Sequence, residues 1–175
     1  GGLELLDDRL NVQLARTMTL LPDDRALLLG GQTLFEPIDH DDIRLLERDG
    51  DGWREVGSFD VWADFVDAVR IASTPDGQFA LVPNGSPMSE DGNQLSLVQI
   101  AGDSLIERPR LPRTEDAREA LFSPDGTTAL VTLLEPGRVL VYAFDGRSLT
   151  QTERIGGIGV ARQMAMVRRG ALSGL

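Results

Sequence analysis

The sequence lacks several residue types on which common site chemistries depend. It contains no cysteine, which excludes disulfides, thiolate nucleophiles and cysteine-ligated metals. All 17 basic residues are arginine, and the absence of lysine excludes Schiff-base chemistry and the lysine of a phosphate-binding P-loop. His40 is the single histidine, so no zinc site with two histidines can form within one chain. Most familiar enzyme mechanisms are thereby excluded.

The chain also lacks long apolar runs and an excess of positive charge. No stretch approaches the ~18 consecutive apolar residues that a membrane span requires, and nothing at the N-terminus resembles a signal peptide. The net charge of −11 repels nucleic-acid backbones and anionic membranes, so we expect neither as a partner. A chain of 175 residues, 41% of them hydrophobic, is expected to form a single domain over residues 1–175, because each half alone would have a marginal core.

What the sequence does contain is a repeat. A Pro-Asp turn occurs three times, at spacings of 53 and 49 residues, as Pro22-Asp23-Asp24, Pro75-Asp76-Gly77 and Pro124-Asp125-Gly126. An alternating segment precedes each turn and an apolar run follows it, which predicts a first strand and a buried second strand. A third apolar strand follows in each repeat, at residues 43–46, 95–98 and 139–142. A polar fourth strand is then expected around Trp53, Leu105 and Leu149.

This period predicts an all-β fold, a β-propeller with about four blades of four antiparallel strands. Three repeats cover about residues 16–66, 67–116 and 117–161. A split blade is expected from residues 162–175 plus 1–15, because Leu3–Leu6 matches Ile43–Leu46 and Arg168-Arg169-Gly170 matches a degraded turn. The ring then closes within one chain, between two copies as eight blades, or as a slice of a longer propeller. We place the one-chain ring behind the other two.

The register around the turns also predicts which side chains are buried between blades. These are Met18, Leu20, Leu28, Ile71, Leu81, Phe122, Leu130 and Val141.

Residues 118–126, with the SPDG turn, and residues 139–146 resemble the YVTN and lactonase-like β-propeller repeats, which are similar in architecture to WD40-like propellers. The resemblance implies a propeller of typically six or seven blades and an extracytoplasmic location, periplasmic or secreted. Lactonase-like members use an arginine six residues before the turn proline, and an Asn-Glu pair after the second strand. The chain keeps this arginine at Arg118, but has Leu133-Leu134 where the pair would lie. The resemblance therefore implies a ligand-facing arginine and argues against lactone hydrolysis.

Four arginines form the candidate ligand-binding set, since the first strand of each blade lines the central channel. Arg16, Arg118 and Arg162 share one register, and Arg70 lies one position later. A ring of guanidinium groups at the channel mouth attracts carboxylate or phosphate. The alternative is that each arginine pairs with a neighbouring acid; Asp116 is placed to reach Arg118. Trp62, in a loop between blades, is either an aromatic anchor for a partner or packs beneath its own loop.

The acidic loops on the same face contain the best metal candidates. Asp39, Asp41 and Asp42 offer oxygen ligands of the kind that Ca²⁺ or Mg²⁺ prefers, although acidic loop tips are usually only solvated. We expect no other cofactor, and the catalytic residues are unknown.

Two classes of function follow from these observations. The first is a non-catalytic propeller module that binds a partner protein or a small anionic ligand at one channel mouth, as a homodimer or as part of a longer propeller. The second is an enzyme on the same face, a lactonase-like or metal-assisted hydrolase. A structural repeat of a larger surface or secreted protein is a third alternative.

Overall fold

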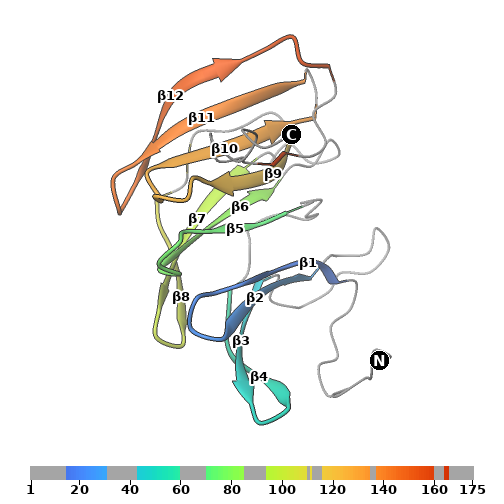
Figure 1. Ribbon diagram of the computed structural model, residues 1–175, viewed down its shortest axis with the longest axis vertical. Coiled ribbons are helices and arrows are strands. Elements are labelled where there is room, and N and C mark those ends of the chain that lie inside the picture. Colours follow the sequence, from blue (N-terminus) through green and yellow to red (C-terminus); the bar gives the residue numbers. More distant parts are fainter. Residues whose placement is uncertain are drawn as a thin grey trace, which may run out of the picture.

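The described residues of the chain form three four-stranded antiparallel sheets, which correspond to the three complete repeats of the sequence (Figure 1). The computed structural model describes residues 15–30, 43–59, 70–84, 94–109, 111, 116–134, 137–159 and 164–165. In each sheet the strands are hydrogen-bonded in chain order, which makes each sheet one propeller blade. The expected split blade falls almost entirely outside the described residues.

Each blade takes its four strands from one repeat. The first blade contains β1 (Ala15–Leu20), β2 (Arg25–Gly30), β3 (Ile43–Asp49) and β4 (Gly52–Phe59). The second blade contains β5 (Ala72–Ser73), β6 (Phe79–Asn84), β7 (Gln94–Ala101) and β8 (Ser104–Glu107). The third blade contains β9 (Ala117–Phe122), β10 (Thr128–Leu133), β11 (Arg138–Phe144) and β12 (Leu149–Ile155).

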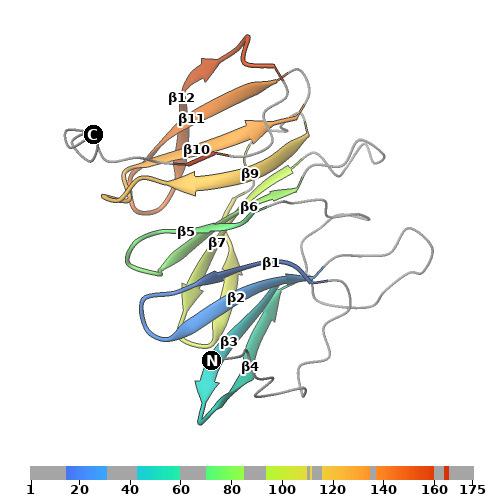
Figure 2. The same cartoon turned by 45° about the vertical axis from the view of Figure 1, so that its right-hand side comes forward.

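The blades pack face to face, and the two interfaces form the main hydrophobic core (Figure 2). Between the first and second blades, Leu27 and Leu29 on β2 belong to the same buried cluster as Val82 on β6. Between the second and third blades, Leu81 on β6 shares a cluster with Val131 on β10. Alternate residues of β6 therefore serve the two interfaces, which is why this strand is apolar on both faces.

The predicted buried positions are confirmed in part. Leu28, Ile71 and Leu81 are buried, and Phe122, Leu130 and Val141 are half-buried. The prediction is wrong for Met18 and Leu20, which are 55% and 65% exposed. Both lie on the face of β1 that points away from the second blade, and within the described residues no further blade covers that face.

Two turn glycines lie against the proline of the preceding blade. Gly77 has a φ of 69°, and a Cβ added there would lie 2.7 Å from Cδ of Pro22. Gly126 has a φ of 72°, and its Cβ would lie 3.1 Å from Cδ of Pro75. The backbone conformation thus favours glycine at both positions, and the contact with Pro22 leaves no space for a side chain at Gly77.

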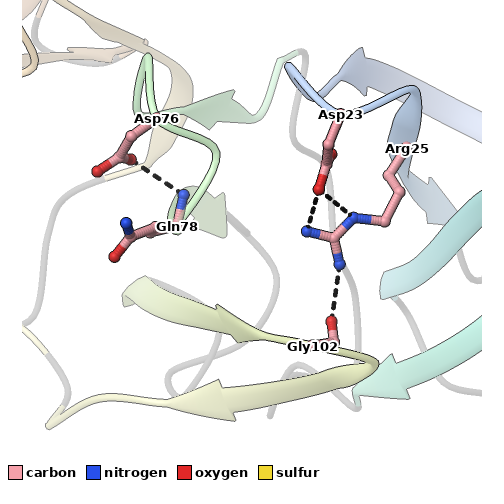
Figure 3. Close-up of polar contacts among 5 residues, drawn as sticks. All are labelled: Asp23, Arg25, Asp76, Gln78 and Gly102. Carbon is pink, nitrogen blue, oxygen red and sulfur yellow. Dashed lines mark hydrogen bonds and ion pairs between the residues drawn. The ribbon is translucent and has the colours of Figure 1, made fainter.

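The aspartate of the turn plays different parts in the first two blades (Figure 3). The Asp76 carboxylate accepts a hydrogen bond from the Gln78 backbone N–H at 3.0 Å, which stabilises the turn itself. Asp23 instead holds the Arg25 guanidinium by an ion pair of 2.6 Å, and Arg25 Nη1 donates to the Gly102 carbonyl at 2.7 Å. Because Gly102 lies in the β7–β8 turn, Arg25 connects the first blade to the second. The hydrogen bond from Arg25 lowers the pKa of Asp23.

Replacing Gly77 by alanine tests the contact between turn and proline. We expect Gly77→Ala to destabilise the protein by more than Gly50→Ala, because Gly50 has a similar φ of 61° but no atom within 4 Å of its added Cβ. The control measures only the cost of the left-handed backbone, ~1–2 kcal/mol. Urea denaturation measures both free energies of unfolding; equal losses in the two variants would show that Pro22 is not in contact.

Candidate functional site

The two ends of the inner strands β1, β5 and β9 form two candidate sites around the propeller axis. At the turn end, three consecutive residues of each blade line a pocket of about 340 Å³. These residues are Leu20–Pro22, Ser73–Pro75 and Phe122–Pro124. These residues lie where the first hairpin of each blade turns. The three hairpin turns lie on one side of the molecule in Figure 2.

This pocket is lined by leucine, phenylalanine and proline side chains together with three hydroxyl residues, and none of its lining side chains is titratable. The Thr74 hydroxyl donates to the Asp76 carboxylate at 2.5 Å, and the Ser123 hydroxyl donates to Asp125. These hydroxyls stabilise the turns. The hydrogen bonds from Ser123 and Thr127 lower the pKa of Asp125 to about 2. The sequence analysis missed the pocket, although the signal was present: its residues hold the same three positions up to each turn proline.

At the opposite end of the strands lies Arg118, which is buried and paired. Its Nε lies 2.7 Å from Oδ1 of Asp116, and the two side chains are 9% and 13% exposed. Arg118 is the extra residue of a β-bulge, since Ala117 and Glu119 pair with consecutive residues of β10. Asp116 adopts a positive φ of 38°, which is uncommon for a residue other than glycine. Of the two alternatives for Arg118, the geometry is that of an ion pair with Asp116 and not that of a guanidinium open to solvent.

Arg70 is the exposed arginine at this end. Its side chain is 46% exposed, and its Nη1 lies 3.1 Å from Oε1 of Glu119, which is fully buried. The same nitrogen donates to the Met164 carbonyl at 3.5 Å. Glu119 Oε2 accepts a hydrogen bond from the Met164 backbone N–H at 2.5 Å. Glu119 thereby connects β9 both to Arg70 and to the segment that follows β12.

The backbone brings Arg70 and Glu119 together. Arg70 forms a parallel bridge with Glu119, with the Arg70 N–H donating to the Arg118 carbonyl at 3.3 Å and the Ala120 N–H donating to the Arg70 carbonyl at 3.2 Å. Burial of Glu119 raises its pKa, against the opposing effects of the Met164 hydrogen bond and the Arg70 charge. Two acid–base pairs, Arg70–Glu119 and Asp116–Arg118, therefore lie at this end of β9, and we call the two pairs together the inner-strand cluster.

The structure places only some of the other sequence-predicted site residues. Arg16 is the extra residue of a bulge in β1, between Ala15 and Thr17, so it holds the same position in its blade as Arg118. Arg162, Trp62 and the metal candidates Asp39, Asp41 and Asp42 lie outside the described residues.

Two other features are absent from the described residues. Among these residues, no group of three or more histidine, cysteine or acidic side chains is placed to hold a metal ion. Nor does the described part of the chain contain a helix with the length and hydropathy to span a bilayer.

By sequence, neither a family model nor a curated protein matches the chain. By structure, it matches β-propellers, including lactonase-like ones, over most of its length. A candidate 6-phosphogluconolactonase from Bacteroides fragilis matches with a TM-score of 0.55 and 18% identity, over 82% of this chain and 42% of its own. A Lactobacillus plantarum protein matches with a TM-score of 0.63 and 18% identity, over 85% and 42% of the two chains.

A WD40-like resemblance is present too. Sqt1 from Saccharomyces cerevisiae matches with a TM-score of 0.64 and 14% identity, over 89% of this chain and 38% of its own. The chain thus spans about two fifths of the length of the propellers that it matches. At these identities the likeness shows the fold alone.

The buried carboxylate of Glu119 predicts a pH dependence of stability. Its pKa is raised from the ordinary 4.5, so above that pH the folded state holds a proton that the unfolded state has lost. The contribution of Glu119 to the free energy of unfolding therefore falls as the pH rises above 4.5. We expect Glu119→Gln to gain stability relative to the unmutated protein as the pH rises above 4.5.

Denaturant titrations across this pH range measure the effect, with exposed Glu153→Gln as the control for loss of one carboxylate. A Glu119→Gln curve parallel to that of the unmutated protein would contradict the raised pKa.

Proposed function

We propose that this chain is a non-catalytic propeller module that binds a partner or small ligand through a carboxylate or phosphate group at the Arg70 end of the channel. The observation that carries the proposal is Arg70 itself: a guanidinium that is 46% exposed, just before the inner strand β5, and held in place by a buried carboxylate. Arginine recognises carboxylate and phosphate with two parallel hydrogen bonds.

The arrangement supports binding because Arg70 is oriented in advance. Both contacts of its guanidinium to described residues use Nη1, with Glu119 and with Met164. Its Nη2 and Nε form no hydrogen bond or ion pair with a described residue, so these two nitrogens are the donors that we assign to an oxyanion. The conformational entropy of a long side chain is already partly lost, so less is lost on binding.

The same cluster explains why Arg118 is a weaker candidate than Arg70. Arg118 is 8% exposed and its charge is neutralised by Asp116, so a ligand would have to break a buried ion pair to reach it. Removing one partner of such a pair costs ~3–5 kcal/mol. We therefore assign Arg118 and Asp116 to stability, and Arg70 to ligand contact.

A hydrolase is the second candidate. A buried carboxyl group with a raised pKa, such as Glu119, is a common feature of acid–base catalysts, and one matched propeller is a candidate 6-phosphogluconolactonase. Against this function, Glu119 is fully buried and no substrate contacts it without displacing Arg70 or Met164. Binding is therefore the function that we favour.

Anion binding is tested by thermal denaturation with citrate or phosphate. We expect either anion to raise the melting temperature of the unmutated protein, and Arg70→Gln to abolish the shift. Arg147→Gln, in the exposed β11–β12 turn, removes the same charge and should keep the shift. A shift that survives in Arg70→Gln, or no shift in the unmutated protein, would refute the proposed site. Hydrolysis of lactone substrates that is lost in Glu119→Gln would favour the second candidate.

A further inference from the structure

The pocket at the turn end of the inner strands has a fixed shape, because the turns that form it rest on one another. Gly77 and Gly126 each lie against the turn proline of the preceding blade. The volume of about 340 Å³ falls in the lower part of the range of about 300–1,000 Å³ that is usual for ligand sites. Among the lining residues Leu21 is buried, whereas Leu20 is 65% exposed. The pocket is therefore preformed and open to solvent.

Most polar groups in the pocket walls are already used within the turns. The Thr74 and Ser123 hydroxyls donate to the turn aspartates. The backbone carbonyls of the same two residues accept hydrogen bonds from the N–H groups of Gly77 and Gly126. The Ser73 hydroxyl, by contrast, forms no hydrogen bond with a described residue. An apolar group therefore fits these walls, and one hydroxyl remains to orient it.

Two aspartates beside the pocket carry a negative charge that no described cation neutralises. Asp76 and Asp125 directly follow lining prolines, and each accepts a hydrogen bond from a lining hydroxyl through Oδ1. The same Oδ1 atoms accept the backbone N–H groups of Gln78 and Thr127. Oδ2 of each aspartate forms no hydrogen bond or ion pair with a described residue, as Figure 3 shows for Asp76. With a pKa of about 2, Asp125 is ionised at neutral pH.

The charge of the three turns as a whole is negative. Residues 20–25, 73–78 and 122–127 contain four aspartates and one basic residue, Arg25. Arg25 is held by Asp23 at 2.6 Å in the first turn, so it does not neutralise the second and third turns. The pocket is thus lined by apolar groups and has acidic side chains beside it. The occupant that complements it combines an apolar group with positive charge.

We propose that this pocket binds a peptide segment of a partner protein in which an apolar side chain is flanked by basic residues. The apolar side chain enters the pocket, the basic side chains contact Oδ2 of Asp76 and Asp125, and the Ser73 hydroxyl donates to a peptide carbonyl. A peptide is favoured over a small amine because the two carboxylates belong to turns of different blades, and one chain supplies a cation to each. The site lies at the opposite end of the inner strands from Arg70, so it does not rest on the anion site.

Nuclear magnetic resonance titration of the isotopically labelled protein tests the site. The probe is a blocked peptide with a leucine between two arginines. We expect saturable shifts of amide signals in the three turns, residues 20–25, 73–78 and 122–127. Alanine in place of the leucine should weaken binding about tenfold, because less apolar area is buried. A peptide with glutamate in place of both arginines should not bind. No saturable shift, shifts confined to other residues, or equal binding of the three peptides would overturn the proposal.

Charge is tested in the protein by Asp76→Asn together with Asp125→Asn. Asparagine keeps Oδ1 as the acceptor that the turn needs and removes only the charge. We expect the double variant to bind the leucine peptide about fivefold more weakly, with a smaller salt dependence. Asp145→Asn is the matched control, because Oδ1 of Asp145 accepts backbone N–H groups in the same way in the β11–β12 turn, away from the pocket. Equal affinities of the double variant and the control would overturn the role of the carboxylates.

The apolar contact is tested by Leu20→Ser. Because Leu20 is exposed, the change should leave the blades folded and weaken peptide binding about threefold. Ile106→Ser is the control, since Ile106 is 45% exposed on β8 and does not line the pocket. Equal affinities of these two variants would overturn the apolar contact.

Two further measurements separate this site from the alternatives. Hexylamine, which has an apolar group and one charge, should bind more weakly than the leucine peptide. Binding of hexylamine as tight as that of the peptide would overturn the peptide in favour of a small amine. Arg70→Gln should bind the leucine peptide with unchanged affinity, so loss of the anion site would leave this inference standing. A loss of peptide binding in Arg70→Gln would place the peptide at the other end of the strands and overturn the pocket.

Discussion

Burial of both faces of each sheet by neighbouring sheets is the constraint on which the other features of this molecule depend. A blade is one layer thick, so Leu27 and Leu29 of the first blade leave water only because the second blade supplies Ala80 and Val82. Each such leucine contributes ~1.5–3 kcal/mol when fully buried. Stability is therefore located between repeats more than within them, as in other quasi-linear repeat proteins.

The same close approach produces the polar chemistry near the axis. Inner strands of neighbouring blades come near enough for Arg70 to form backbone hydrogen bonds across to β9, which buries the Glu119 carboxylate between them. A buried acid needs a partner, and Arg70 and the Met164 N–H supply one. At the same end of β9, the bulge contains Arg118, which forms a second buried ion pair with Asp116. The candidate site is thus a consequence of how two blades meet.

The sequence pattern within each repeat was sufficient to predict the strands of a blade, but not the contacts between one blade and the next. Turn chemistry and strand period located three sheets, and the alignment of Trp53, Leu105 and Leu149 is confirmed by their equivalent positions in the β3–β4, β7–β8 and β11–β12 pairs. The alternation of side chains along a strand identifies the face of the sheet on which each one lies, but not whether another sheet covers that face. The prediction that Met18 and Leu20 are buried was wrong for this reason. The pocket of three blades and the Glu119 contacts depend on distances between repeats, which no single repeat encodes. The pairing of Arg118 with Asp116 was one of two open alternatives.

The contact of a turn glycine with the proline of the blade before it has a consequence for how such a chain can evolve. Because Pro22 limits residue 77 and Pro75 limits residue 126, the sequence permitted in one repeat is set by its neighbour. The second and third repeats carry the same proline and the same glycine, so either could follow any repeat that has the turn proline. The first repeat has Asp24 in place of the glycine, and moving it behind such a repeat would bring a side chain against the proline. The contacts therefore permit exchange among repeats that keep the glycine and disfavour moving the one that lacks it.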